Sequence, residues 1–239
     1  MMKAFWALFA TEAKLAIRSG DMILFGLLFP VGIMLLIGFI SGPEATRLGF
    51  GGTAAVGICA AGLMGIPLTF ANYRHDKILK RFRVTPVSPA TLVLADTLVQ
   101  AIFAVVSGFA VYLVATVGFG VTIAGSPLRY ALTFAFTLAS IFSLGFLIAS
   151  LAPSVKAANL ACTVLYFPML FLSGATVPYE ILPRGLKAVA DWFPLTEGIK
   201  LLKGAVLGLD VARDAPGFLA LALVAAVSCV LSAIFFRWE

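Results

Sequence analysis

Charged side chains are scarce in this chain of 239 residues: they make up 12% of it, whereas hydrophobic residues make up 62%. A soluble domain typically contains about 25% charged residues. Too few polar side chains are therefore present to cover a water-facing surface. This scarcity excludes a soluble enzyme, a secreted disulfide-linked scaffold and a disordered chain, and it indicates a membrane protein.

Residues that carry chemistry are also scarce. The chain has one histidine, His75, and three cysteines (Cys59, Cys162 and Cys229) without C-x-x-C spacing. Neither a metal site nor an intramembrane enzyme with a nucleophile and its base is indicated, and the cysteines are expected to be small buried apolar residues. No phosphate-binding loop of the form G-x-x-x-x-G-K-[ST] is found. We predict no catalytic residue, metal site or cofactor in this chain.

Long uncharged apolar stretches dominate the sequence instead. A helix needs about 20 apolar residues to cross the hydrocarbon core of a bilayer, and it satisfies its own backbone hydrogen bonds there. Pro30, Pro67 and Pro168 fall inside such stretches and are expected to kink the helices. The sequence predicts an all-α membrane protein with six transmembrane helices, near residues 22–40, 53–72, 97–120, 130–151, 158–174 and 216–236.

Basic residues indicate the orientation. They gather in the N-terminal segment and in the 73–91 connection, which contains Arg74, Lys77, Lys80, Arg81 and Arg83. The positive-inside rule then places both termini and the 73–91 loop in the cytoplasm, and the 175–215 segment outside. The net charge of +6 fits anionic lipid headgroups or an acidic cytoplasmic partner, with no nucleic acid expected. We predict one multi-pass domain, residues 1–239, in the cell inner (plasma) membrane.

Residues 1–21 are amphipathic. On a helix, Lys3, Ala7, Thr11, Lys14 and Arg18 share one face, and Gly20 ends the segment before the first span. A basic stripe beside bulky apolar residues is typical of a helix lying in the headgroup layer, although an ordinary charged flank is the alternative. The residues expected to meet the interface are Trp6, Lys14 and Arg18.

The 73–91 connection also has a helical pattern. Residues 74–83 suit a short helix with Asp76 and Lys80 four residues apart. Ile78, Leu79 and Phe82 give this helix an apolar side. That side either docks on a partner or lies on the protein itself or on lipid, and composition does not separate these alternatives.

The 175–215 segment is divided by Pro178, Pro183 and Pro194 into pieces too short to span. They suit re-entrant helices, one of them beginning at Leu195 with an apolar stripe through Ile199, Leu202 and Val206.

Few polar side chains interrupt the spans. Asp96 is expected near the cytoplasmic end of the third span, where it can reach water. Asn72 and Gln100 are expected to hydrogen-bond between helices rather than to line a pathway.

Three runs carry a resemblance to a known family. They are Leu-Lys-Arg-Phe-Arg-Val-Thr-Pro-Val-Ser-Pro from Leu79, Phe-Leu-Ser-Gly from Phe171 with Pro178 after it, and Phe-Pro-Leu-Thr from Phe193. With the order of the spans, the chain resembles the permease subunit of ABC-type-2 exporters over nearly its whole length. Where that family often has an acid-acid-Gly-Thr run, this chain has His75-Asp76-Lys77-Ile78.

The resemblance implies a function and partners. The 73–91 loop would be a coupling helix on a separate ATPase subunit, which would hold ATP and magnesium. A second permease copy or a close paralogue would complete a dimeric pathway that exports a drug, lipid or other amphiphilic compound. The residues implied to couple are Arg74, Asp76, Ile78, Leu79, Lys80, Arg81, Phe82 and Arg83, and those implied at an extracytoplasmic gate are Ser173, Gly174, Pro178 and Pro194.

The alternative is an ion-coupled secondary transporter or channel. Such proteins usually place ionisable side chains within their spans. Here Asp96 is the one marginal example among the six predicted helices.

Overall fold

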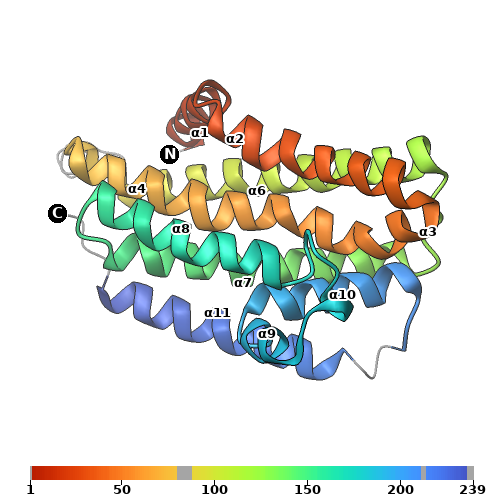
Figure 1. The fold of residues 1–239 in the computed structure, drawn as a ribbon. Helices are drawn as coiled ribbons and strands as arrows, with labels where there is room; N and C mark the ends of the chain where they lie inside the picture. The colour runs from red at the N-terminus through yellow and green to blue at the C-terminus, as the bar shows by residue number, and fades with distance from the viewer. Residues whose placement is uncertain (1, 80–87, 211–213, 236–239) are drawn as a thin grey trace.

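The computed structural model describes residues 2–79, 88–210 and 214–235, and in these ranges the regular structure is entirely helical. The long helices run side by side along one direction, whereas α1 and the short α9 lie across it (Figure 1). Their bounds in chain order are α1 Met2–Arg18, α2 Asp21–Ile23, η1 Leu24–Leu28, α3 Phe29–Ala60, η2 Ala61–Gly65, α4 Ile66–His75, α6 Pro89–Leu113, η3 Val114–Gly118, α7 Pro127–Leu151, α8 Val155–Leu172, η4 Tyr179–Ile181, α9 Arg184–Ala190, α10 Pro194–Leu207 and α11 Ala215–Phe235.

The first two predicted spans form one helical run, Leu24–His75, of 52 residues. The run reverses at Gly42, whose φ of 77° breaks α3 and is readily adopted only by glycine, and Pro43 starts the returning part. Figure 1 shows the two parts lying antiparallel. The loop predicted between the first two spans, from about residue 41 to residue 52, is therefore wrong, because the helix resumes directly after the turn.

Five helical segments of the described chain are long and apolar enough to cross a membrane, rather than the six predicted. The number differs because the Leu24–His75 run is continuous. At about 1.5 Å per residue it is more than twice as long as a hydrocarbon core of about 30 Å is thick. The other four are Ala90–Gly118, Pro127–Leu151, Val155–Leu172 and Ala215–Phe235.

The start of α6 also differs from the prediction. The helix begins at Pro89 rather than near residue 97, and the Ser88 hydroxyl accepts a hydrogen bond from the Ala90 N–H (3.3 Å). Proline suits the first helical position because the N–H that it lacks would have no helical partner there. Pro89 thus starts the helix.

Two π-helical segments, η1 and η2, lie just before two of the prolines expected to kink the helices. Pro30 and Pro67 occupy the first turn of the α-helix that follows each segment. Such segments widen the helix locally and recur at functional sites. The helix type therefore changes beside Pro30 and Pro67, whereas Pro168 lies inside the continuous α8.

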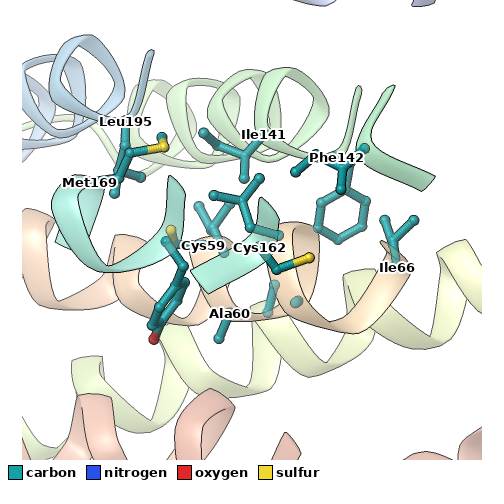
Figure 2. Close-up of a cluster of buried hydrophobic side chains, with 14 of the residues drawn as sticks. Cys59, Ala60, Ile66, Ile141, Phe142, Cys162, Met169 and Leu195 are labelled. Carbon is teal, nitrogen blue, oxygen red and sulfur yellow. The ribbon is translucent and has the colours of Figure 1, made fainter. Parts of the chain in front are cut away.

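Side chains from α3, η2, α4, α7, α8 and α10 share one core (Figure 2). Ile66, Ile141, Cys162 and Met169 are almost fully buried there. Cys59 is buried as well, but Cys229 is exposed on α11, so the prediction of three buried cysteines is wrong for one of them.

The 175–215 segment forms η4, α9 and α10. The 14 residues of α10 are too few to span a bilayer. Its predicted apolar stripe is confirmed, since Leu195, Ile199, Leu202 and Val206 are all buried. The helix packs on α3, α7 and α11, so its apolar face is covered by the chain's own core.

Candidate functional site

The end of α4 begins the connection that the sequence singles out. The Arg74 guanidinium donates a hydrogen bond to the Ala149 carbonyl near the end of α7. Asp76 is exposed beside His75, whose Nδ1 lies 3.0 Å from its carboxylate. The chain then turns at Lys77, which has a φ of 58°. Arg74 is thus anchored within the chain, while Asp76 faces outward.

The two apolar residues that follow differ in exposure. Ile78 is half-buried, whereas Leu79 is only 1% exposed and belongs to the same buried cluster as Phe70, Tyr73 and Leu92. The expectation that Leu79 offers its side chain to a partner is therefore wrong, because the side chain lies on the protein itself. The remaining predicted coupling residues, Lys80, Arg81, Phe82 and Arg83, lie outside the described residues.

Helix α1 has the predicted exposed basic face. Lys14 and Arg18 are exposed, and Trp6 is 57% exposed with its ring edge-to-face against Phe5 and Phe9. The helix packs against α6. Its amphipathic character is confirmed, and its position in the headgroup layer stays a prediction.

One buried polar residue of α1, Glu12, was not predicted from the sequence. Glu12 is buried and accepts a hydrogen bond from the Tyr73 hydroxyl at the end of α4. Burial raises the pKa of the Glu12 carboxyl above its usual value, and the bond from Tyr73 opposes that shift. The signal was available: at about 100° per residue, Glu12 falls beside Leu8 and Phe9 on the apolar face.

A second buried carboxyl lies on α6. Asp96 is 2% exposed, so the prediction that it reaches water is wrong. It lies about two turns inside the helix, because α6 begins earlier than expected. The Gln100 amide donates to Asp96 from one turn further along (3.4 Å). This bond lies within α6, whereas the sequence suggested one between helices.

A cavity of about 440 Å³ brings these residues together. It is bounded by α1, η1, η2, α4 and α6, with Glu12, Tyr73, Asp96 and Gln100 on its polar wall. The exposed Asn72 lies at the same cavity. Sequence reasoning treated these side chains separately because they come from three segments of the chain.

The predicted gate residues follow α8. Ser173 is buried, Pro178 is exposed and Pro194 is the half-buried first residue of α10. A Cβ built on Gly52 of α3 would lie 2.4 Å from the Gly174 carbonyl oxygen. The segment that contains Ser173 and Gly174 is thus packed directly on α3, whereas Pro178 and Pro194 each lead into a short helix.

Ion pairs hold those short helices together. Lys200 Nζ lies 3.0 Å from Asp191 and 2.7 Å from Glu197, and the Tyr179 hydroxyl donates to Asp191 (2.6 Å). The bonds from Tyr179 and Lys200 lower the pKa of the Asp191 carboxyl. Many of the charges of this nearly neutral segment thus pair with one another.

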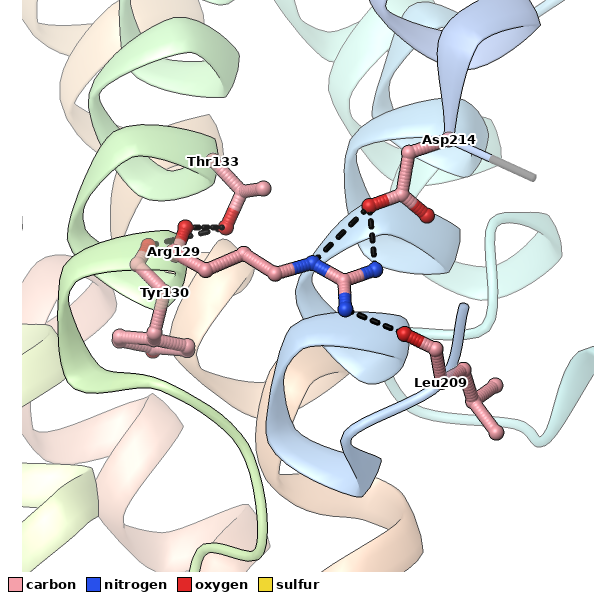
Figure 3. A network of polar contacts seen from close by, with 5 residues as sticks. All are labelled: Arg129, Tyr130, Thr133, Leu209 and Asp214. Atoms are coloured by element: carbon pink, nitrogen blue, oxygen red, sulfur yellow. Dashed lines mark hydrogen bonds and ion pairs between the residues drawn. The ribbon is translucent and has the colours of Figure 1, made fainter. Parts of the chain in front are cut away.

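Arg129 connects the start of α7 to the stretch that joins α10 and α11 (Figure 3). Its Nε lies 3.1 Å from Asp214, its Nη2 contacts the same carboxylate, and Nη1 donates to the Leu209 carbonyl. The Asp214 side chain is nearly buried. The pair therefore fixes α7 and α11 at the end of the bundle opposite Arg74.

Residues 3–207 match the family described as "ABC-2 type transporter". The chain belongs to this family. ABC-2 proteins are membrane permeases without an ATPase domain, which confirms the prediction that this chain is not the motor. ABC-2 permeases pair with ABC ATPase subunits, and they are multi-pass proteins typically found in the plasma membrane.

Similar proteins from three organisms carry the name Nodulation protein J. The one from Rhizobium leguminosarum bv. viciae is 30% identical over 193 residues, which are 80% of this chain and 73% of the relative. The one from Sinorhizobium fredii (strain NBRC 101917 / NGR234) is 31% identical over 81% of this chain and 71% of the relative. The one from Rhizobium meliloti (strain 1021) is 30% identical over 90% and 81%.

Proposed function

We propose that this ABC-2 permease is the transmembrane subunit of an ATP-driven exporter. The observation that carries the proposal is the family match over residues 3–207. The permease forms the translocation pathway as a dimer, with a second copy or a close paralogue. Separate ATPase subunits bind ATP and magnesium, and this chain holds no cofactor.

The proposed topology has six crossings in a single permease domain, residues 1–239. The reversal at Gly42 supports it, because the Leu24–His75 run can cross the membrane twice. Both termini and the coupling loop, residues 73–91, are cytoplasmic, and residues 1–21 lie at the interface. The 175–215 segment is extracytoplasmic and re-entrant, which the shortness of α9 and α10 supports.

Coupling is proposed to pass through the connection after α4. The bond from Arg74 to Ala149 joins this connection to α7, and the bond between Tyr73 and Glu12 joins it to α1. A push on the connection would therefore reach two helices directly. The residues proposed to meet the ATPase are Asp76, Ile78, Lys80, Arg81, Phe82 and Arg83, while Arg74 and Leu79 hold the connection on the bundle.

The proposed cargo is a drug, lipid or other amphiphilic compound. Exposed apolar side chains cover much of the spans, as on Leu98, Ile102 and Phe109 of α6. The relatives are named for nodulation.

Changing the coupling loop should separate ATP hydrolysis from transport. The permease is co-expressed with its ABC ATPase subunit, and the ATPase that co-purifies is measured along with export. Phe82→Ala should weaken co-purification, since an apolar anchor at an interface centre typically contributes more than about 1–2 kcal/mol. Arg81→Glu should also impair assembly by opposing acids on the partner.

The control is Arg184→Ala on α9, which is exposed and lies in an element remote from the end of α4 (Figure 1), and it should leave assembly unchanged. Full export and normal ATPase binding by both loop variants would show that the loop is only a connector. ATP hydrolysis by the purified permease alone would contradict the exporter proposal itself.

Orientation can be tested by cysteine labelling in a background in which Cys59, Cys162 and Cys229 are replaced. A cysteine at the exposed His75 should react with a membrane-impermeant thiol reagent only in inverted vesicles. A cysteine at the exposed Arg184 should react in intact cells whose outer envelope is permeable. Labelling of both sites from one side, or the reverse pattern, would refute the topology.

A further inference from the structure

The cavity between α1 and the spans has a chemical character that the coupling proposal does not explain. Two carboxyl groups line it, Glu12 and Asp96, and none of the described residues on its wall is a lysine, arginine or histidine. Both groups line the same cavity, so a negative charge on one disfavours a negative charge on the other. A buried acid pair without a positive partner is costly unless a bound cation or proton compensates it.

Two acceptor atoms at the cavity are unsatisfied. Asp96 and Gln100 are each 2% exposed, and no described residue donates a hydrogen bond to Asp96 Oδ2 or Gln100 Oε1. Buried polar atoms normally have partners, so each unsatisfied atom requires an explanation. Because both atoms are acceptors, the missing group must supply N–H or O–H donors.

Much of the remaining wall is apolar. Leu15 of α1, Phe25 of η1 and Met64 of η2 face the same space. The flexible methionine side chain adapts to apolar groups of varied shape, and the phenylalanine ring offers a large apolar surface. The volume of about 440 Å³ falls within the usual range for small-molecule sites, roughly 300–1,000 Å³. Two of the three π-helical segments in the described ranges, η1 and η2, contribute to the wall, and such segments are frequent at functional sites.

From these observations we propose that the cavity binds the primary ammonium group of an amphiphilic compound. The ammonium lies between Glu12 and Asp96 and donates hydrogen bonds to Asp96 Oδ2 and Gln100 Oε1, while the apolar part rests on Phe25 and Met64. An inorganic metal ion fits less well, because the described residues contain no group of three or more metal-binding side chains. That the compound is cargo rests on the proposed exporter function, whereas the binding itself does not.

Binding can be measured with monodansylcadaverine, a fluorescent primary amine, on the purified chain in detergent without any ATPase. Its N-acetyl derivative is the neutral control. The amine should bind with a rise in dansyl fluorescence, and the acetylated probe should bind roughly 10- to 100-fold more weakly, because a hydrogen bond to a charged group is lost. Equal binding of the two probes would overturn the proposal.

Variants locate the site. Asp96→Asn and Glu12→Gln keep the shape of the side chain and should each weaken amine binding about tenfold or more. Glu44→Gln is the matched control, because Glu44 is exposed on α3 and pairs with Arg47. Melting midpoints are recorded for all variants. If Asp96→Asn does not fold, Glu12→Gln and Gln100→Leu carry the test, and unchanged affinity in these variants would refute the assignment.

The same ammonium chemistry is found in phosphatidylethanolamine headgroups. The assay is therefore repeated in nanodiscs of phosphatidylglycerol with and without phosphatidylethanolamine. Competition by phosphatidylethanolamine identifies a lipid headgroup as the occupant, and unchanged probe affinity identifies a separate amphiphilic amine. Failure of binding while ATPase co-purification persists would reject this site and leave the exporter role intact.

Discussion

Leu79→Ala is expected to lower the free energy of unfolding of the permease by about 2–5 kcal/mol. The Leu79 side chain is 1% exposed and belongs to the main core cluster. Removing its terminal carbons loses buried apolar surface and leaves a cavity that neighbouring helices fill only partly. A leucine that touched only a partner would instead change ATPase binding and leave the stability of the isolated chain unaltered.

Thermal unfolding in detergent separates these cases. Cys59 and Cys162 are buried and become reactive on unfolding, so a thiol-reactive dye reports the transition once the exposed Cys229 is replaced by serine. Ile78→Ala is the matched control, because Ile78 is half-buried at the adjacent position and should cost less. A melting curve of Leu79→Ala that overlays the reference would contradict its place in the core.

The long apolar segments could be predicted from composition because a span needs a continuous apolar length, and α7, α8 and α11 begin and end close to the predicted residues. The immediate return of the helix after Gly42 could not, because Gly42, Pro43 and the charged residues up to Arg47 have the composition of a loop. Only the left-handed backbone at Gly42, with φ of 77°, reveals that the helix resumes at Pro43.

The polar cavity shows a different limit of sequence reasoning. Glu12, Tyr73 and Asp96 are distant in the chain and meet only when α1 packs beside α4 and α6. None of these residues alone indicated a binding site. Asp96, for example, was expected only to lie near the cytoplasmic end of the third span. Their combined meaning depends on the absence of a base among the described lining residues, which is a property of three-dimensional packing and not of any local motif.

Helix packing explains the second large effect, which is expected for Gly145→Ala. A Cβ built on Gly145 of α7 would lie 2.0 Å from the Gly62 carbonyl oxygen of η2, a distance at which the two backbones must separate. Small residues allow membrane helices to approach closely, and overpacking of this kind typically costs about 1–3 kcal/mol or more.

Gly32→Ala is the matched control for this prediction. Gly32 also lies in a helix, but its added Cβ would meet nothing within 4 Å, so alanine should leave stability unchanged or raise it by roughly 0.5–1 kcal/mol. The melting midpoint should therefore fall for Gly145→Ala alone. Because Met64 and Gly65 of η2 also line the cavity, displacing η2 should weaken amine binding as well. If Gly145→Ala melts like the reference, α7 and η2 are not in direct backbone contact, and the wall of the cavity is placed wrongly.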